Sequence, residues 1–305
     1  MQKITTFLWF DDNAEEAVDF YTSVFGNSKV NNTTRYTEES AKASGRPIGS
    51  VMTVAFSLHG QPFTAINGGP AFKFNPSVSF FIYCKTENEI EELWNKLSED
   101  GKILMALDKY PFSEKYGWLE DKFGVSWQII ISTMEIEQKI VPSLMFTKNV
   151  TGKAEEAINF YTSVFSQNDV SANNSKAVNF FKYEAGQAPD EDSKIAYADF
   201  TLGGQKFAAM DGGHMHDFAY NEAISFVVNC KDQTELDHFW NKLSEGGDPK
   251  AQMCGWLKDK YGLSWQIVPD NLSDLLSGKE PGKSRRVMQK VLQMKKLDID
   301  TLKRA

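Results

Sequence analysis

Two histidines close together are the most suggestive metal ligands in this sequence. His214 and His216 are two residues apart, so an extended segment could present both imidazoles on one side, with Asp211 or Asp217 nearby. The first half of the chain has Pro70-Ala71-Phe72 at the corresponding place. Because the pair does not recur, we interpret it as a surface loop and keep an adventitious metal site there as the alternative.

Cys254 is the candidate for a reactive thiol. It stands before Gly255-Trp256, where the first half of the chain has Tyr116, and no charged neighbour is present to lower its pKa. Cys84 and Cys230 each end an apolar run, so we predict that they are core thiols. Three cysteines without a CxxC pair, in a chain that does not open on a secretion signal, predict reduced thiols and a cytoplasmic location.

The elements that must position these side chains come in two copies. Three segments recur in the same order, at offsets of 140, 146 and 138 residues: Phe20–Phe25 at Phe160–Phe165, Trp94–Glu99 at Trp240–Glu245, and Gly117–Ile129 at Gly255–Ile267, the last with 10 of 13 residues identical. This period is too long for a solenoid. We therefore predict copy one at residues 1–134, copy two at 135–270, and a tail at 271–305.

Each copy repeats a strand–helix–strands pattern twice. In copy one, apolar runs predict strands at 4–10, 50–58, 62–66, 78–84 and 125–131. Helical periodicity predicts one helix beginning near Glu15 and another at 87–98. Many strands and only two helices per copy predict an α+β fold with antiparallel sheet rather than a doubly wound parallel fold.

These motifs resemble a known family. The combination of LWF, AEEAVDFYTSVF, a Gly-Gly hairpin, WNKLSEGG and CGWLKDKYGLSWQIVP is similar to the PhnB-like branch of the glyoxalase/bleomycin-resistance/dioxygenase (vicinal oxygen chelate) superfamily. The resemblance covers residues 4–131 and 140–269. It implies tandem glyoxalase-like domains, each of two βαβββ modules with curved mixed or antiparallel sheets around a ligand cavity, followed here by a helical tail. Such domains often carry the label 3-demethylubiquinone-9 3-methyltransferase.

The resemblance also implies where a metal would bind, since active members hold a divalent metal with His and Glu on the first and last strands of paired modules. Those positions fall here on hydroxyl, amide or methyl side chains: Thr6, Ser143, Ser77 or Ser79, Ala223 or Ser225, Gln128 and Gln266. Such groups are poor ligands for a transition metal. We therefore expect no metal at the usual site and no other cofactor. The alternative is a lyase, isomerase or dioxygenase that holds a divalent metal with non-standard ligands.

The same positions predict a ligand cavity. Alternation along a strand puts Ser126 and Gln128 on one face and Trp127 on the other. The predicted lining is Thr6, Ser126, Gln128, Ser143, Ser264, Gln266 and Cys254. The resemblance places Cys254 near the cavity mouth. A buried amide suits a polar group on an apolar ligand. The equally weighted alternative is that each glutamine ties down a neighbouring strand.

The two copies differ around this cavity. Copy one spends eight more residues than copy two between Lys102 and Gly117, and this insert contains Tyr110-Pro111-Phe112. The insert could cover one cavity. Copy two is closer to the family pattern, so we expect the working cavity there if only one copy binds a ligand.

Charge separates the tail from the rest of the chain. The chain has 33 Lys and Arg against 41 Asp and Glu, a net charge of -8. Residues 279–305 hold nine basic and three acidic side chains, so this part of the tail carries +6 and residues 1–278 carry -14. An acidic body argues against nucleic-acid binding. The sequence contains no run of 18 apolar residues, so we predict no membrane span. Val287, Val291 and Met294 predict an amphipathic helix that docks on the acidic body or on a partner subunit of a homodimer, rather than on a membrane or nucleic acid.

Together these features predict a cytoplasmic protein that binds a small organic molecule and lacks the usual metal. The metal enzyme described above and an interaction scaffold are the alternatives, so the sequence leaves open whether the chain is an enzyme. We do not expect methyltransferase activity, because the Gly-Gly pairs lie in predicted hairpins and not in the strand-to-helix turn that binds a nucleotide-like cofactor.

Overall fold

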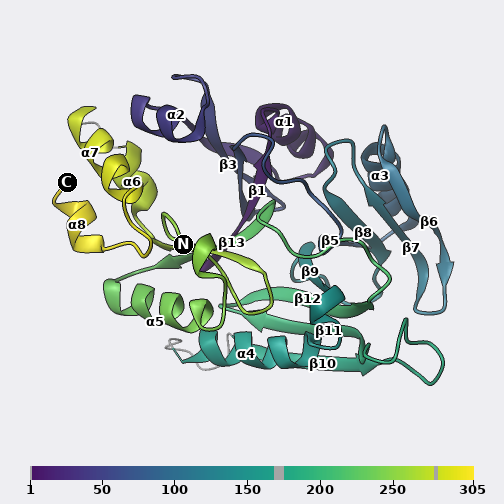
Figure 1. Cartoon of the computed structure of the whole chain (residues 1–305). Helices are drawn as coiled ribbons and strands as arrows, with labels where there is room; N and C mark the ends of the chain where they lie inside the picture. The colour runs from purple at the N-terminus through teal and green to yellow at the C-terminus, as the bar shows by residue number, and fades with distance from the viewer. Residues whose placement is uncertain (1, 168–174, 278–280) are drawn as a thin grey trace. The chain divides into compact units, whose positions relative to one another are not determined.

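The computed structural model describes residues 2–167, 175–277 and 281–305, which fold into two compact units (Figure 1). Unit 1 comprises residues 1–19, 28–73 and 221–305, and unit 2 comprises residues 20–27 and 74–220. Each unit therefore combines one half of copy one with one half of copy two. The sequence copies and the compact units do not coincide.

Unit 1 is built on a seven-stranded mixed sheet with the order β14-β15-β13-β1-β4-β3-β2. Its strands are β1 (Ile4–Phe10), β2 (Lys29–Arg35), β3 (Val51–Leu58), β4 (Gln61–Asn67), β13 (Ile224–Cys230), β14 (Trp256–Lys258) and β15 (Ser264–Pro269). Its helices are α2 (Glu38–Ser44), α5 (Gln233–Ser244), η2 (Pro249–Ala251), α6 (Leu272–Ser277), α7 (Pro281–Val291) and α8 (Ile299–Lys303). The central pair, β1 and β13, is antiparallel and joins the two copies.

Unit 2 is built on an eight-stranded mixed sheet with the order β10-β11-β12-β9-β5-β8-β7-β6. Its strands are β5 (Val78–Cys84), β6 (Lys102–Tyr110), β7 (Ser113–Glu120), β8 (Ser126–Ile131), β9 (Ile140–Thr147), β10 (Lys176–Lys182), β11 (Ile195–Leu202) and β12 (Gln205–Gly213). Its helices are α3 (Glu87–Ser98), η1 (Lys148–Val150) and α4 (Ala154–Ser166). The chain passes from unit 1 to unit 2 within α1 (Ala14–Val24).

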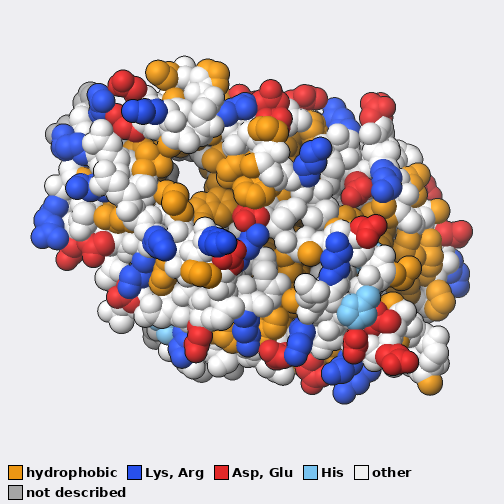
Figure 2. All heavy atoms as spheres, viewed as in Figure 1, with side chains coloured by type: hydrophobic (Ala, Val, Ile, Leu, Met, Phe, Trp, Pro, Cys, Tyr) orange, Lys and Arg blue, Asp and Glu red, His pale blue; other side chains and the backbone are white. Residues whose placement is uncertain are grey.

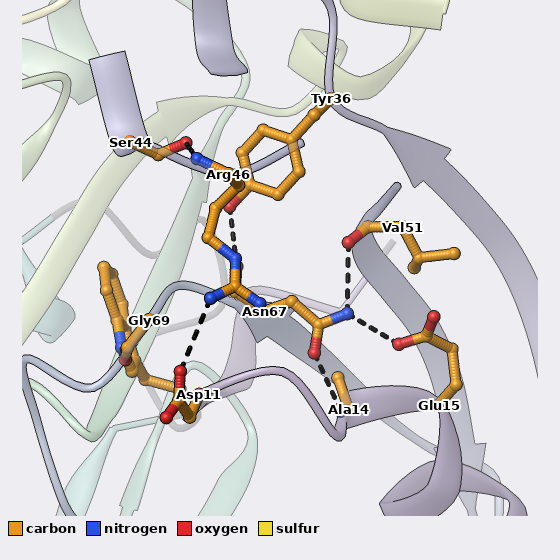
Figure 3. A network of polar contacts seen from close by, with 10 residues as sticks. Asp11, Ala14, Glu15, Tyr36, Ser44, Arg46, Val51, Asn67 and Gly69 are labelled. Carbon is orange, nitrogen blue, oxygen red and sulfur yellow. Dashed lines mark hydrogen bonds and ion pairs between the residues drawn. The ribbon is translucent and has the colours of Figure 1, made fainter. Parts of the chain in front are cut away.

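The helices begin where polar side chains satisfy their free backbone N–H groups. Asn67 does so for α1: its side-chain oxygen accepts from the N–H of Ala14 (2.8 Å), and its amide nitrogen donates to Glu15 (2.6 Å) and to the carbonyl of Val51 (3.0 Å), as Figure 3 shows. Asp211 accepts from the N–H of Ala154 (3.2 Å) at the start of α4. Equivalent caps thus join β4 to α1 and β12 to α4, whereas α3 and α5 are capped by Thr86 and Asp232 next to them in the chain.

The two faces of each sheet differ in chemistry. Trp127 and Trp265 are almost fully buried on one face, and Trp127 packs there against Tyr21 and Phe25 of α1. The opposite face carries Gln128 in unit 2 and Gln266 in unit 1, and we call it the inner face.

Candidate functional site

The inner face of unit 2 carries a buried amide that is hydrogen-bonded through both its oxygen and its nitrogen. The Tyr116 hydroxyl donates to Gln128 Oε1 (2.7 Å), and Gln128 Nε2 donates to Ser79 Oγ (2.8 Å). All three side chains are buried, and burial raises the pKa of Tyr116, which keeps its hydroxyl a donor. Gln128 therefore ties β7, β8 and β5 together.

Aromatic side chains fill the space around this amide. Phe81, Tyr116, Val141 and Ala208 form a buried cluster. Tyr110 and Phe112 of the copy-one insert pack against Tyr116, with ring centroids 5.6 Å and 5.1 Å apart. Trp118 Nε1 donates to the buried Ser126 Oγ (2.8 Å). Side chains of the β6–β7 hairpin, which forms one edge of the sheet, thus pack against the cluster beside Gln128.

Unit 1 has the same amide without the tyrosine. Gln266 Nε2 donates to Ser225 Oγ (3.0 Å), as Gln128 does to Ser79. The repeat aligns Tyr116 of β7 with the much smaller Cys254, which lies in the turn before β14 with a φ of 55°. Ser264 Oγ, the counterpart of Ser126 Oγ, is buried and has no hydrogen-bond partner among the described residues. Burying a hydroxyl without a partner costs about 1–3 kcal/mol, so this position favours an incoming polar group.

Aromatic rings flank that amide in unit 1. Trp256, which pairs with Gln266 across β14 and β15, meets Phe7 edge-on at 5.6 Å and Trp9 at 6.1 Å between ring centroids. Trp9 and Trp256 are both half-buried. None of these three rings was among the predicted lining residues. Trp256 could have been found from the repeat, which aligns it with Trp118 in the recurring Gly-Trp-Leu segment.

Thr6 does not line this cavity. In the β1–β13 register Thr6 lies opposite Phe226, whose neighbour on β15 is Trp265, and so it belongs to the outer, helix-covered face. Phe7 lies opposite Ser225 and takes the inner position, just as Ser143 lies opposite Ser79 in unit 2. The Thr6 placement is therefore corrected by one residue. Ser143 Oγ is buried and has no hydrogen-bond partner in the described part of the chain.

Cys254 sits at the junction of the sheet and the tail. Its N–H donates to the carbonyl of Met294 (2.7 Å), and the N–H of Gly255 donates to the carbonyl of Lys295 (2.8 Å). Burial raises the pKa of the half-buried Cys254 thiol, so little thiolate forms near neutral pH. This environment favours a structural role over a nucleophilic one.

The tail helices pack on unit 1. Val287, Met288 and Val291 of α7 are buried, Arg285 forms ion pairs with Glu38 (3.3 Å) and Glu39 of α2, and Lys296 pairs with Asp237 of α5 (2.8 Å). Figure 2 shows a hollow framed by hydrophobic side chains, in the region that Figure 1 places between α6 and α7 on one side and β1 and β3 on the other. The tail therefore forms one wall of an apolar opening in unit 1.

The residues at the usual ligand positions do not fit a transition metal. Phe7, Ser225 and Gln266 hold these positions in unit 1, and Ser143, Ser79 and Gln128 hold them in unit 2. No group of three or more His, Cys, Asp or Glu side chains within the described ranges is arranged to hold a metal ion. Hydroxyl, amide and phenyl groups supply neither the imidazole nor the carboxylate that such a metal prefers.

The histidine pair is divided between different partners. His214 Nε2 contacts Asp192 Oδ2 (2.8 Å), which raises the pKa of His214. His216 stacks on Phe218 with 4.7 Å between ring centroids, and burial lowers its pKa. Asp211 is fully buried, and besides Ala154 it bonds the N–H groups of Lys194 and Ile195. The two imidazoles and the Asp211 carboxylate are thus engaged separately.

Comparison with known proteins identifies relatives of both halves of the chain. A family model described as 3-demethylubiquinone-9 3-methyltransferase matches residues 2–130 and again residues 138–268. A PhnB protein from Bacillus cereus is 46% identical over 43% of this chain and 100% of its own, with a TM-score of 0.40. A Staphylococcus aureus protein is 37% identical over 43% of this chain and 97% of its own, with a TM-score of 0.18. No curated protein matches.

A longer structural likeness supports the fold. Glyoxalase I from Zea mays aligns with 88% of this chain and 92% of its own, at 13% identity and a TM-score of 0.53. The predicted α+β fold of tandem glyoxalase-like domains with C-terminal helices is confirmed. Within 2–167, 175–277 and 281–305, no helix is both long and apolar enough to cross a bilayer.

Proposed function

We propose that this chain, which belongs to the family described as 3-demethylubiquinone-9 3-methyltransferase, binds a small organic molecule at Gln266 in unit 1. In unit 2 the hydroxyl of Tyr116 donates to the equivalent amide, and unit 1 has no tyrosine at the aligned position. The exchange of Tyr116 for Cys254 carries the proposal. Gln266 and Ser264 offer polar contacts, while Phe7, Trp9 and Trp256 offer apolar ones. This combination suits a planar molecule with one neutral polar group.

The binding we propose needs no metal, because the donor set described above does not suit one. Methyl transfer, which the family description names, also lacks support. Gly68-Gly69 follows β4 and Gly212-Gly213 ends β12, and the strand-to-helix turns among the described residues contain at most the single Gly152. A nucleotide-like cofactor requires a glycine-rich turn at a helix N-terminus. We therefore favour sequestration of the ligand. The three free cysteines support a reducing, cytoplasmic setting.

A thermal-shift screen of small planar aromatics, with 2-naphthamide as the first probe, tests the proposal. A ligand that binds only the folded state raises the melting temperature. We expect Cys254→Tyr, which recreates the copy-one residue, to weaken binding of a hit at least ~10-fold, which corresponds to ~1.4 kcal/mol. Gln266→Met should weaken binding by a similar factor through the lost hydrogen bond.

Gln128→Met is the matched control, since it alters the same amide in unit 2. It should lower stability by leaving the buried Tyr116 and Ser79 hydroxyls unpaired, and it should leave affinity unchanged. Equal weakening by Gln128→Met, or no effect of Cys254→Tyr, would contradict the proposal. Metal analysis of the same samples tests the alternative, which requires one tightly held divalent ion per chain.

A further inference from the structure

A cavity lies wholly within unit 2, and its lining does not include Gln128. It has a volume of about 460 Å³ and is lined in part by the segment of residues 132–138, which links the two copies. A volume of a few hundred Å³ is typical of sites for small organic ligands. Gln138 holds the linker in place, donating to the carbonyl of Lys206 (3.0 Å) and accepting from its N–H (2.8 Å).

Aromatic side chains form the apolar part of this cavity. The hydroxyls of Tyr83 and Tyr197 lie 3.1 Å apart, and Phe181 packs at 6.1 Å from the ring of Tyr197. Phe181, Val178 and Met134 line the cavity yet are 56%, 49% and 77% exposed. Large apolar side chains gathered and exposed at one opening are a feature of ligand sites.

The charges in the cavity are not balanced. Three acidic side chains and one lysine line it: Glu135, Glu137, Asp199 and Lys206. The lysine is neutralised by Glu137 at 2.8 Å. Asp199 accepts hydrogen bonds from the neutral amide of Asn179 (2.9 Å and 3.2 Å), and no cation pairs with it among the described residues.

Asp199 also acts on the two tyrosines. Burial is the largest cause of the raised pKa of Tyr83 and of Tyr197, and the negative charge of Asp199 contributes to the rise in both. Both phenols therefore stay neutral at physiological pH. Their rings line the same cavity as a carboxylate that has no counter-ion among the described residues.

We propose that this cavity is a second ligand site, which binds an organic cation with a planar apolar body. The rings of Tyr83, Tyr197 and Phe181 would hold the body, and Asp199 would pair with the positive charge. The site is separate from the one proposed at Gln266 and uses a different chemistry, since that site offers neutral polar groups only.

Isothermal titration of the full chain with three probes tests the proposal: N-methylquinolinium, the neutral N-methyl-2-quinolone and the anion 2-naphthalenesulfonate. The bicyclic bodies are similar, so affinity differences report the charge. We expect the cation to bind at least ~10-fold more tightly than the neutral probe, and the anion more weakly than either. Equal affinities for cation and neutral probe would overturn the proposal.

Matched variants locate the charge. Asp199→Asn should abolish the preference for the cation and leave the neutral probe unaffected, whereas Glu191→Gln, which removes an exposed acid outside the cavity, should preserve it. Phe181→Ala, which truncates an exposed ring, should weaken both probes. A cation preference that survives Asp199→Asn would overturn the assignment.

Unfolding measurements keep the test independent of folding artefacts. Each variant is unfolded in urea, and a change in affinity counts only where the free energy of unfolding stays close to that of the wild type. Cys254→Tyr, which fills unit 1, should leave binding of the cation unchanged, so failure of one site is distinguishable from failure of the other.

Discussion

Asp121 is a buried carboxylate on which the local structure of unit 2 depends. Its Oδ2 accepts from Tyr21 Oη and Trp127 Nε1, both at 2.8 Å, and its Oδ1 accepts from the N–H groups of Phe123 and Val125 at 2.9 Å and 3.0 Å. Asp259 binds Trp265 Nε1 in unit 1 in the same way. The aspartate of the repeated GWLxDK segment thus joins a tight turn to the core tryptophan.

Asp121 should give the stability of the protein a measurable pH dependence. Burial raises its pKa from 3.8 to about 6, although its four hydrogen bonds oppose the rise. The folded state then binds the proton more tightly than the unfolded state, so this contribution to stability is present below pH ~4 and lost as the pH rises through ~6, by roughly 3 kcal/mol.

The comparison variant is Asp121→Asn, which does not titrate. Urea unfolding at a series of pH values from ~3.5 to ~7 should show the stability of the wild type falling relative to the variant. A parallel dependence in both proteins would mean that Asp121 keeps its ordinary pKa.

A single residue of the site could be predicted only where the sequence shows which face of its strand it lies on. Ser126 and Gln128 share a strand with the recognisable Trp127, so alternation alone placed them on the inner face. Thr6 precedes a loop whose length differs between the copies, so the repeated helix does not fix which residues of β1 face inward, and the inner position falls on Phe7 instead. A one-residue error moves a side chain to the other face.

At the scale of elements, the tail shows both what periodicity predicts and where it ends. Val287 and Val291 lie on the buried side of α7, as their spacing predicts. Met294, predicted on the same helix, follows the end of α7 at Val291. Its carbonyl instead accepts from Cys254, and this contact could not be deduced because it depends on the turn before β14.

Leu297 should be the residue that holds the end of the tail in place. It is fully buried, and a Cβ added to Gly255 would lie only 3.3 Å from its Cδ1 atom. We expect Leu297→Ala to lower the free energy of unfolding by about 2–5 kcal/mol, the usual cost of a cavity in a packed core. Lys295→Ala, at an exposed neighbour, should change it by less than ~0.5 kcal/mol. Similar values for the two variants in urea titrations would show that the tail end is not packed.

At the scale of the whole molecule, the repeat predicted two copies, but it could not show how they share two sheets. Pairing of β1 with β13 and of β5 with β9 joins the copies in both units. A repeat establishes which segments are equivalent and gives no information about which strand edges meet.

An isolated copy one, residues 1–134, should therefore not remain a folded monomer. Its β1 and β5 would each expose an edge that the full chain covers with a strand of copy two. Unpaired edges associate, so we expect a dimer in which β1 of one molecule pairs with β5 of another. Light scattering after size exclusion measures the mass; a folded monomer would contradict the shared-sheet arrangement.

The exchange of Tyr116 for Cys254 has a consequence for how well the fold tolerates substitutions. Changes around Gln128 break a network that holds three strands together, so they should lower the free energy of unfolding strongly. The positions around Gln266 lack the tyrosine of that network, so changes there should cost less stability. Libraries of variants at the two glutamines should therefore differ in the fraction of members that stay folded.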